Sequence, residues 1–376
     1  MAGLYVHIPF CASRCIYCDF YSTTLSNLRH DYINALCREM DLRKNYFTVP
    51  IGIFPQVIKT IYVGGGTPSQ LTEKEFNSLF CHIRKTFGDS AEEITVEVNP
   101  DDVTDGLVST LVENGVNRVS MGAQTFDDSR LRFLHRRHCA MQVDKAIYKL
   151  RNAGITNISI DLMFGFPNES VDSWEQDIDH AVDLSPNHIS GYSLMYEEGT
   201  ALWKMKERGM VKAIDDDTSL KMYEILIDKL CQVGYEHYEI SNFTKPGFRS
   251  IHNSSYWNDT PYIGLGAAAH SYNRKSRQWN VADVRKYIRS IGEGKIPATI
   301  ERIDERTHYN DLVTTELRTS EGICLDSLQK KFREFLMENS LQYINEGLME
   351  TNGSYLKITR KGLYISDAIM SDMVMV

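Results

Sequence analysis

Short runs of apolar and β-branched residues alternate with longer segments of helical periodicity over the N-terminal part of the chain. Residues 57–63, VIKTIYV, form such a run, and residues 72–87 follow with apolar side chains at helical spacing. Thr72 and Glu75 occupy the positions of a capping box, which predicts the start of that helix. Strands that alternate with helices of about ten to fifteen residues indicate right-handed crossovers and a parallel sheet.

This order of strand and helix recurs, and glycine or polar residues follow the strands. Six such units predict an α/β fold, an open or closed (β/α)6 barrel of the TIM type, with its ligand site at the carboxyl ends of the strands. Strands are predicted at the start of the chain and over residues 57–63, 93–98, 118–121, 158–164 and 188–194, and helices over residues 28–45, 72–87, 104–114, 142–152, 171–183 and 216–233.

The periodicity weakens after the sixth strand, and the composition changes to charged helices from Pro297 onward. The C-terminal pattern predicts a mainly helical module with a small β wing, similar to a winged helix. The expected domains are residues 1–235, 236–297 and 298–376. The expected elements are a tyrosine-rich strand over 235–243, an irregular segment holding 252–257, helices over 309–317 and 325–345, a hairpin around Asn352 and Gly353, and a last helix from Gly362.

Composition narrows the class of protein. The 376 residues are 42% hydrophobic, enough for an extensive buried core, and the formal charge of -9 gives no basic footprint for nucleic acid. The chain does not begin with charged residues followed by a long apolar run, so we expect neither a signal peptide nor a spanning helix. Any contact with a membrane is expected to be peripheral. Five scattered cysteines suit a reducing, cytoplasmic compartment: Cys37, Cys81, Cys139, Cys231 and Cys324.

The remaining three cysteines, Cys11, Cys15 and Cys18, fall within eight residues just after the first strand. One loop can therefore wrap their thiolates around a single inorganic centre. Soft thiolates select iron–sulfur clusters, zinc or copper(I) over hard cations. A structural zinc site is closed by four ligands, so three cysteines without an evident fourth partner favour a centre that keeps one position open. A zinc knuckle, or three unrelated buried cysteines, is the alternative.

The Cys-x3-Cys-x2-Cys spacing, with Tyr17 directly before the last cysteine, resembles the signature of the radical S-adenosylmethionine (SAM) enzymes. The resemblance implies a partial (β/α)6 barrel and a [4Fe-4S] cluster held by Cys11, Cys15 and Cys18, with SAM chelating the fourth iron. It also implies that one electron from the cluster cleaves SAM to a 5′-deoxyadenosyl radical, chemistry that belongs to the cofactor while the protein positions it.

Further residues enter the predicted SAM site through the same resemblance. Gly64, Gly65 and Gly66 alone could form a tight turn, but they are similar to the family's glycine motif. Four polar residues match, by position after their strands, residues that contact SAM in the coproporphyrinogen oxidase branch: Glu97, Gln124, Arg136 and Asp161. Arg137 is the alternative to Arg136. The resemblance thus assigns these residues to cofactor binding: Tyr5, Tyr17, Gly65, Gly66, Thr67, Glu97, Gln124, Arg136 and Asp161.

The motifs YVHIPFC, VGGGTPS, EVNP, SMGAQTF, DLMFGFP and YEEGT, in this order, resemble the HemN/HemW group over nearly the whole chain. Oxygen-independent coproporphyrinogen III oxidases of this group carry a fourth cysteine two residues after the third. Here Asp19 and Phe20 follow Cys18, and the chain begins only four residues before Tyr5, without the longer extension expected of the oxidase. Both departures put oxidative decarboxylation in doubt.

The stretch from His252 to Trp257, HNSSYW, resembles instead the HNxxYW motif of the HemW branch, whose members are heme chaperones. An imidazole can ligate heme iron, and Tyr256 and Trp257 offer flat faces for a porphyrin. His252 is therefore the predicted heme ligand. The alternative is that His252 and Asn253 form a turn while the two aromatic residues pack under the barrel.

The leading hypothesis is a protein that binds a [4Fe-4S] cluster, SAM and heme and passes heme to apo-hemoprotein acceptors, served by an electron donor such as a flavodoxin or ferredoxin. Whether it catalyses a reaction stays open. One alternative is an oxygen-independent coproporphyrinogen III oxidase that oxidatively decarboxylates propionate side chains. Another is a radical SAM enzyme on a different substrate, such as a methyl-transferring enzyme, in which HNSSYW would be structural.

Overall fold

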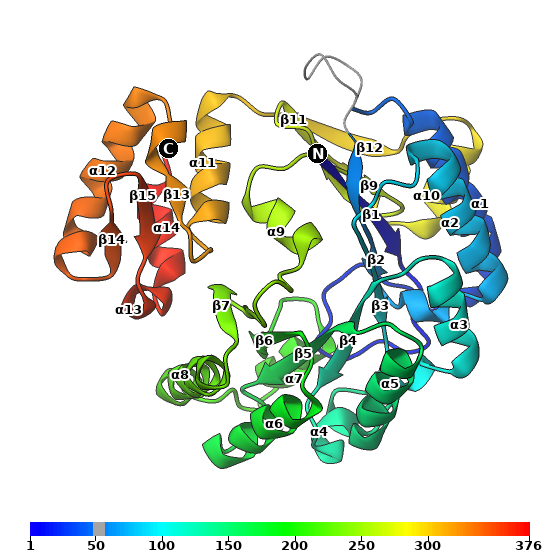
Figure 1. The fold of residues 1–376 in the computed structure, drawn as a ribbon, viewed down its shortest axis with the longest axis horizontal. Coiled ribbons are helices and arrows are strands. Elements are labelled where there is room, and N and C mark those ends of the chain that lie inside the picture. Colours follow the sequence, from blue (N-terminus) through cyan, green and yellow to red (C-terminus); the bar gives the residue numbers. More distant parts are fainter. Residues whose placement is uncertain (48–56) are drawn as a thin grey trace.

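A curved parallel sheet with helices on its outer side forms the larger part of the molecule (Figure 1). The computed structural model describes residues 1–47 and 57–376. Six neighbouring strands run parallel in chain order, which confirms the predicted alternation of strand and helix. They are β1 (Ala2–Ile8), β2 (Ile58–Gly65), β3 (Glu93–Val98), β4 (Arg118–Gln124), β5 (Asn157–Phe164) and β6 (His188–Ser193).

The helices that connect these strands lie close to their predicted positions. They are α1 (Arg29–Arg43), α2 (Glu73–Phe87), α3 (Asp105–Glu113), α5 (Ala140–Asn152), α6 (Val171–Leu184) and α8 (Asp216–Gln232). The predicted capping box is present: the Glu75 amide donates to the Thr72 hydroxyl, and the Thr72 amide donates to the Glu75 carboxylate. Such a cap contributes about 1 kcal/mol. Local sequence thus fixes where the helix begins.

The two faces of the sheet differ in chemistry. Along β1, Leu4 and Val6 belong to the hydrophobic core under the outer helices, whereas Tyr5 and His7 point to the opposite, inner face. Several buried polar side chains extend that inner face across the other strands, among them Thr60, Thr95, Arg118, Ser159 and His188. The helices therefore pack on an apolar surface, while the inside of the curve is polar.

The sheet continues beyond both edges of the six-stranded unit, to a total of twelve strands within the described residues. The sequence analysis did not predict the strands on the β1 side, because they are short and have little periodicity. It was wrong over residues 235–243, which form a hairpin instead of one strand. The added strands are β9 (Tyr262–Leu265), β10 (His270–Tyr272), β11 (Ser276–Asn280) and β12 (Ala298–Arg302) beside β1, and β8 (Asn242–Thr244) and β7 (Glu236–Glu239) beside β6.

Residues 252–257, predicted to be irregular, belong to the short helix α9 (Ile251–Trp257), which lies on the concave side of the sheet (Figure 1). The buried Glu93 side chain on β3 accepts hydrogen bonds from the amides of Ile251 and His252, at 2.8 and 2.9 Å. A carboxylate at a helix N-terminus satisfies otherwise unpaired amides. The Ser250 hydroxyl adds a local cap, because it accepts a hydrogen bond from the Asn253 amide at 3.2 Å. Three more helices also escaped prediction: α4 (Asp128–Phe133), α7 (Ala201–Glu207) and α10 (Val284–Gly292).

The C-terminal elements form a separate helical unit with its own core and a small three-stranded sheet. The predicted hairpin is present, but the helix predicted over 325–345 begins only at Lys330, because residues 325–327 form a 3-10 turn. The domain boundaries stay predictions. The elements are α11 (Glu305–Glu316), β13 (Ile323–Cys324), α12 (Lys330–Asn345), β14 (Met349–Thr351), β15 (Tyr355–Ile358), α13 (Arg360–Leu363) and α14 (Ser366–Met373).

None of the helices in the described part of the chain is both long and apolar enough to cross a membrane.

One buried carboxylate joins the added strands to the rest of the sheet. Glu39 on α1 is fully buried and pairs with Arg43 at 3.1 Å. It also accepts hydrogen bonds from the Tyr287 hydroxyl, the Asn280 amide group and the Gly266 amide. Every one of these partners lies more than 200 positions away except Arg43. Glu39, together with Arg43, which donates to the Gly264 carbonyl and the Ser271 hydroxyl, thus holds the β9–β11 region to α1.

We expect Glu39→Ala to lower the free energy of unfolding by about 3–5 kcal/mol, because the buried Arg43 guanidinium loses its counter-charge. Urea unfolding followed by circular dichroism measures the change. The exposed Glu207→Ala is the control and should stay within about 0.5 kcal/mol of the parent. A loss below about 1 kcal/mol for Glu39→Ala would show that the network is not a structural tie.

Candidate cofactor site

The cysteine loop follows β1 and is closed at its base by main-chain hydrogen bonds. The amide of Cys11 donates to the carbonyl of Thr23 at 2.9 Å, and the amide of Thr23 donates to the carbonyl of Pro9 at 2.7 Å. At the tip, the Ile16 amide donates to the Leu134 carbonyl at 3.2 Å. The loop is therefore closed at its base and bonded to the barrel at its tip. Its cysteines lie over the carboxyl ends of the strands.

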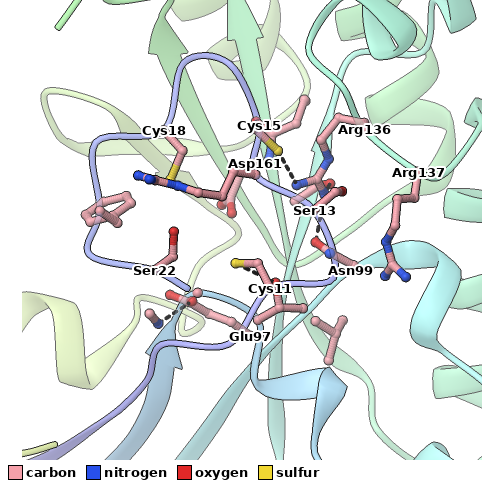
Figure 2. A pocket seen from close by; sticks show the side chains of 18 of the residues that line it. Cys11, Ser13, Cys15, Cys18, Ser22, Glu97, Asn99, Arg136, Arg137 and Asp161 are labelled. Atoms are coloured by element: carbon pink, nitrogen blue, oxygen red, sulfur yellow. Dashed lines mark hydrogen bonds between the residues drawn. The ribbon is translucent and has the colours of Figure 1, made fainter. Parts of the chain in front are cut away.

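A pocket of about 180 Å³ lies under this loop (Figure 2). A water molecule needs roughly 10–15 Å³, so the pocket has room for a ligand much larger than solvent. All predicted site residues line it except Tyr5 and His252. The predicted residues in its wall are Cys11, Cys15, Tyr17, Cys18, Gly65, Gly66, Thr67, Glu97, Gln124, Arg136 and Asp161.

The three thiols surround the pocket instead of meeting at one point (Figure 2). The Thr67 hydroxyl donates to the Cys11 sulfur at 3.4 Å, and Arg136 Nη1 donates to the Cys15 sulfur at 3.7 Å. Within residues 1–47 and 57–376, no three His, Cys, Asp or Glu side chains are close enough to hold a single metal ion. Three thiolates spread around a cavity fit a cluster, which takes each thiolate on a different iron, better than they fit one zinc ion.

Glycine is required where β2 meets the cysteine loop. Gly65 has a φ of +115°, and a Cβ there would lie 2.6 Å from the His7 ring. A Cβ on Gly66 would lie 2.8 Å from the Pro9 carbonyl carbon and 3.0 Å from the Cys11 sulfur. A larger residue would therefore push the loop away from the strand. The glycines bring backbone against the pocket, as the sequence motif led us to expect.

Two partly buried carboxylates, Glu97 and Asp161, lie in the pocket wall. Glu97 accepts hydrogen bonds from the Tyr62 hydroxyl at 2.7 Å and from the Gly65 amide at 3.0 Å. Burial raises the pKa of Glu97 to about 7 and that of Asp161 to about 6. Both carboxyl groups are thus protonated in part near neutral pH and can either donate or accept a hydrogen bond.

The sequence analysis missed Arg118, which begins β4 and points into the polar interior. It is 1% exposed, and none of its guanidinium nitrogens has a hydrogen-bond partner among the described residues. Its positive charge opposes the rise in the pKa values of Glu97 and Asp161. A charged residue at the start of an otherwise buried strand was the available signal.

The choice between the two adjacent arginines now has a geometric basis. Arg136 Nη2 donates to the Asn99 side chain at 2.9 Å and to the Gly122 carbonyl at 2.8 Å, beside its contact with Cys15. Arg137 instead pairs with Asp101 and Asp102, both at 2.7 Å, at the edge of the same pocket. Arg136 is therefore the arginine that lies against the cysteine loop.

Tyr5 and His252 lie on the inner face but outside this pocket. The Tyr5 hydroxyl bonds to His7 Nδ1 at 2.9 Å, and its ring stacks on Tyr62. His252 is fully buried: its Nδ1 bonds to the Thr60 hydroxyl at 2.8 Å and its Nε2 to the Tyr256 hydroxyl at 2.9 Å. Burial lowers the pKa of His252 to about 3, so it is neutral. The role of Tyr5 toward SAM and that of His252 toward heme stay predictions, and neither ring nitrogen of His252 is free in this structure.

Comparisons with known proteins agree with this arrangement. A family model described as the Radical SAM superfamily matches residues 5–181. The chain is 31% identical over 377 residues to the heme chaperone HemW of Lactococcus lactis, covering 99% of this chain and 97% of the relative. It is 34% identical over 383 residues to the heme chaperone HemW of Bacillus subtilis, covering 98% of each. The chain belongs to the HemW family.

The HemW family lies within the radical SAM superfamily, whose members are characterised by a [4Fe-4S] cluster and SAM. Among solved structures, the coproporphyrinogen III oxidase HemN of Escherichia coli matches with a TM-score of 0.85 at 20% identity, over 99% of this chain and 90% of that chain. This likeness concerns the fold, and it confirms the predicted fold class.

We expect Cys18→Ala to abolish cluster assembly, because a cluster that already leaves one iron to SAM has no spare protein ligand. The readout is the visible absorption and the iron content after anaerobic reconstitution with iron and sulfide. Cys81→Ala, an exposed cysteine far from the loop, is the matched control and should assemble the cluster normally. If the parent protein binds zinc tightly and no iron, the cluster assignment is wrong.

Glu97 should make the stability of the cofactor-free protein depend on pH. Its pKa is about 7 when folded and near 4.5 when unfolded, so the folded state holds the proton longer. Relative to Glu97→Gln, the parent should therefore lose stability as pH rises from about 4.5 to about 7, with no further change above. Urea unfolding of both proteins across this range tests the prediction. A stability difference that does not vary with pH would contradict the shifted pKa.

Proposed function

We propose that this protein binds heme and delivers it to acceptor hemoproteins, and that it carries a [4Fe-4S] cluster and SAM in the barrel pocket. The observation that carries the proposal is the similarity over 98–99% of the chain to relatives named heme chaperone HemW. The HNSSYW stretch at residues 252–257 supports it further. Heme acceptors and an electron donor such as a flavodoxin or ferredoxin are its proposed partners, in the cytoplasm and with at most peripheral membrane contact.

The pocket has side chains suited to both cofactors. Cys11, Cys15 and Cys18 would hold the cluster, and the glycine edge of β2 offers main-chain groups to SAM. Glu97 and Asp161 can bond to hydroxyl groups, since both are near their pKa values at neutral pH. When bound, the cluster and SAM together supply one-electron reductive cleavage of a sulfonium. The chain's own residues orient that pair and limit access of water to it.

The main alternative is an oxygen-independent coproporphyrinogen III oxidase, because the chain shares the fold of HemN. The position of the oxidase's fourth cysteine is occupied by Phe20, whose side chain is 66% exposed at the pocket wall. A phenyl ring cannot ligate iron or donate a proton. This substitution disfavours the oxidative decarboxylation that the alternative requires.

The burial of His252 favours a second alternative, a radical SAM enzyme on another substrate. Both nitrogens of its ring are bonded inside the protein, and the ring packs on Tyr62 at 5.1 Å. In that case the HNSSYW stretch would serve only to fill the barrel. Heme binding decides between this candidate and the proposed function.

We expect anaerobically reconstituted protein to bind hemin stoichiometrically and to form no protoporphyrinogen from coproporphyrinogen III in the presence of SAM and a reductant. Absorption spectroscopy measures the first and product analysis the second. Any turnover must disappear in Cys18→Ala to count as radical SAM activity. Formation of protoporphyrinogen by the parent would support the oxidase, and absence of hemin binding would favour the second alternative.

A further inference from the structure

The strands added beside β1 have one buried face and one aromatic face. The buried face contains Ser271, whose hydroxyl accepts a hydrogen bond from Arg43 Nη2 at 3.0 Å. The side chains on the other face follow from register: His270 stands opposite Trp279, and Tyr272 opposite both Tyr262 and Arg277. Alternate residues of a strand point to opposite faces, so these aromatic residues share a surface with His270.

This aromatic face borders a pocket of about 340 Å³, nearly twice the volume of the cofactor pocket. Residues from the end of α9, the following loop, β9 to β11 and α11 line it. Tyr256 and Trp257, the last two residues of the HNSSYW stretch, form part of the wall. The pocket therefore joins the sequence motif to the aromatic face.

His270 is the histidine in the wall of this pocket. Its side chain is exposed and stacks on Trp279 at 6.0 Å, and neither ring nitrogen has a hydrogen-bond partner within residues 1–47 and 57–376. Partial burial and the nearby Arg277 lower its pKa, which favours the neutral imidazole. A neutral, unbonded imidazole is what a heme iron requires. His252 offers no such nitrogen, since both of its own are bonded.

The wall also contains an unpaired donor. The indole N–H of Trp257 is buried and has no acceptor in the described part of the chain, and Arg318 covers the indole at 5.4 Å. A porphyrin presents flat apolar faces and carboxylate edges, which suit the aromatic walls and Arg277, the arginine that lines this pocket. The two carboxylates of the pocket have partners: Asp259 bonds to His308 and Asp311 to Arg277, both at 3.1 Å. They do not present uncompensated negative charge to a propionate.

We propose that heme binds in this pocket between α9, the β9–β11 face and α11, with His270 as an axial ligand of the iron. This inference rests on the proposed function, because it locates the heme that the function requires. In this arrangement His252 positions the motif, since its bond to the Tyr256 hydroxyl orients Tyr256 while α9 stays capped by Glu93. Trp257 then contacts the porphyrin and His270 completes the site from the neighbouring strand.

The test is a hemin titration of the full-length protein and of His270→Ala, monitored through the Soret band and by electron paramagnetic resonance of the ferric iron. We expect His270→Ala to change the ligand signature and to weaken hemin binding by about 10-fold or more, since even outer-shell changes cost a metal site that much. Added free imidazole should restore the parent spectrum, which a merely structural defect would not allow. His30→Ala removes an equally exposed histidine on α1 and should change nothing.

The outcomes separate this inference from the function on which it rests. Hemin binding by the parent with an unchanged spectrum in His270→Ala would overturn the assignment of His270 and leave the proposed function standing. Failure of the parent to bind hemin would overturn both. A spectrum that changes in His270→Ala and returns with imidazole supports the inference.

Discussion

The bond between the Glu93 carboxylate and the first amides of α9 is the contact on which the arrangement of sites depends. The inner face of this barrel is polar, and Glu93 at the start of β3 is buried there. Without the amides of Ile251 and His252, its carboxylate would lose two hydrogen bonds inside the protein, which is costly. By fixing α9 there, it places His252 inside the barrel and leaves Trp257 at the edge. This short helix thus packs against the amino-terminal parts of β2 and β3, while the cysteine loop lies at the carboxyl ends of the strands.

Tyr62 connects the two ends. Its ring packs between Tyr5 and His252, and its hydroxyl donates to Glu97 in the wall of the cofactor pocket. A displacement of α9 would remove one stacking partner of Tyr62 and thereby disturb the residue that holds Glu97. Contacts therefore run from the HNSSYW stretch to the pocket without passing through the outer helices. The pocket under the cysteine loop and the pocket proposed for heme both border this inner face.

Sequence reasoning succeeded where the determining interactions are local. The strands and helices of the six units show strong periodicity, and Cys11, Cys15 and Cys18, which lie within eight residues, line one pocket as their spacing suggested. It failed where distant residues decide the structure. Strand β9 pairs with β1 across about 260 positions, and α9 is capped in part by a carboxylate on β3. His252 illustrates the difference: the motif suggested a functional stretch, but only the fold shows that both ring nitrogens of His252 are bonded inside the barrel.

Heme should occupy a site separate from that of the cluster and SAM, and α9 should stay in the barrel when heme binds. Hydrogen–deuterium exchange of the reconstituted protein, with hemin or SAM added, tests this most directly. We expect hemin to protect β9 to β11 and α11, to leave the amides of Ile251 and His252 as protected as before, and to spare the glycine loop after β2, which SAM should protect instead. Loss of protection at Ile251 and His252 on adding hemin would contradict the account, because it would mean that heme draws His252 out of the barrel.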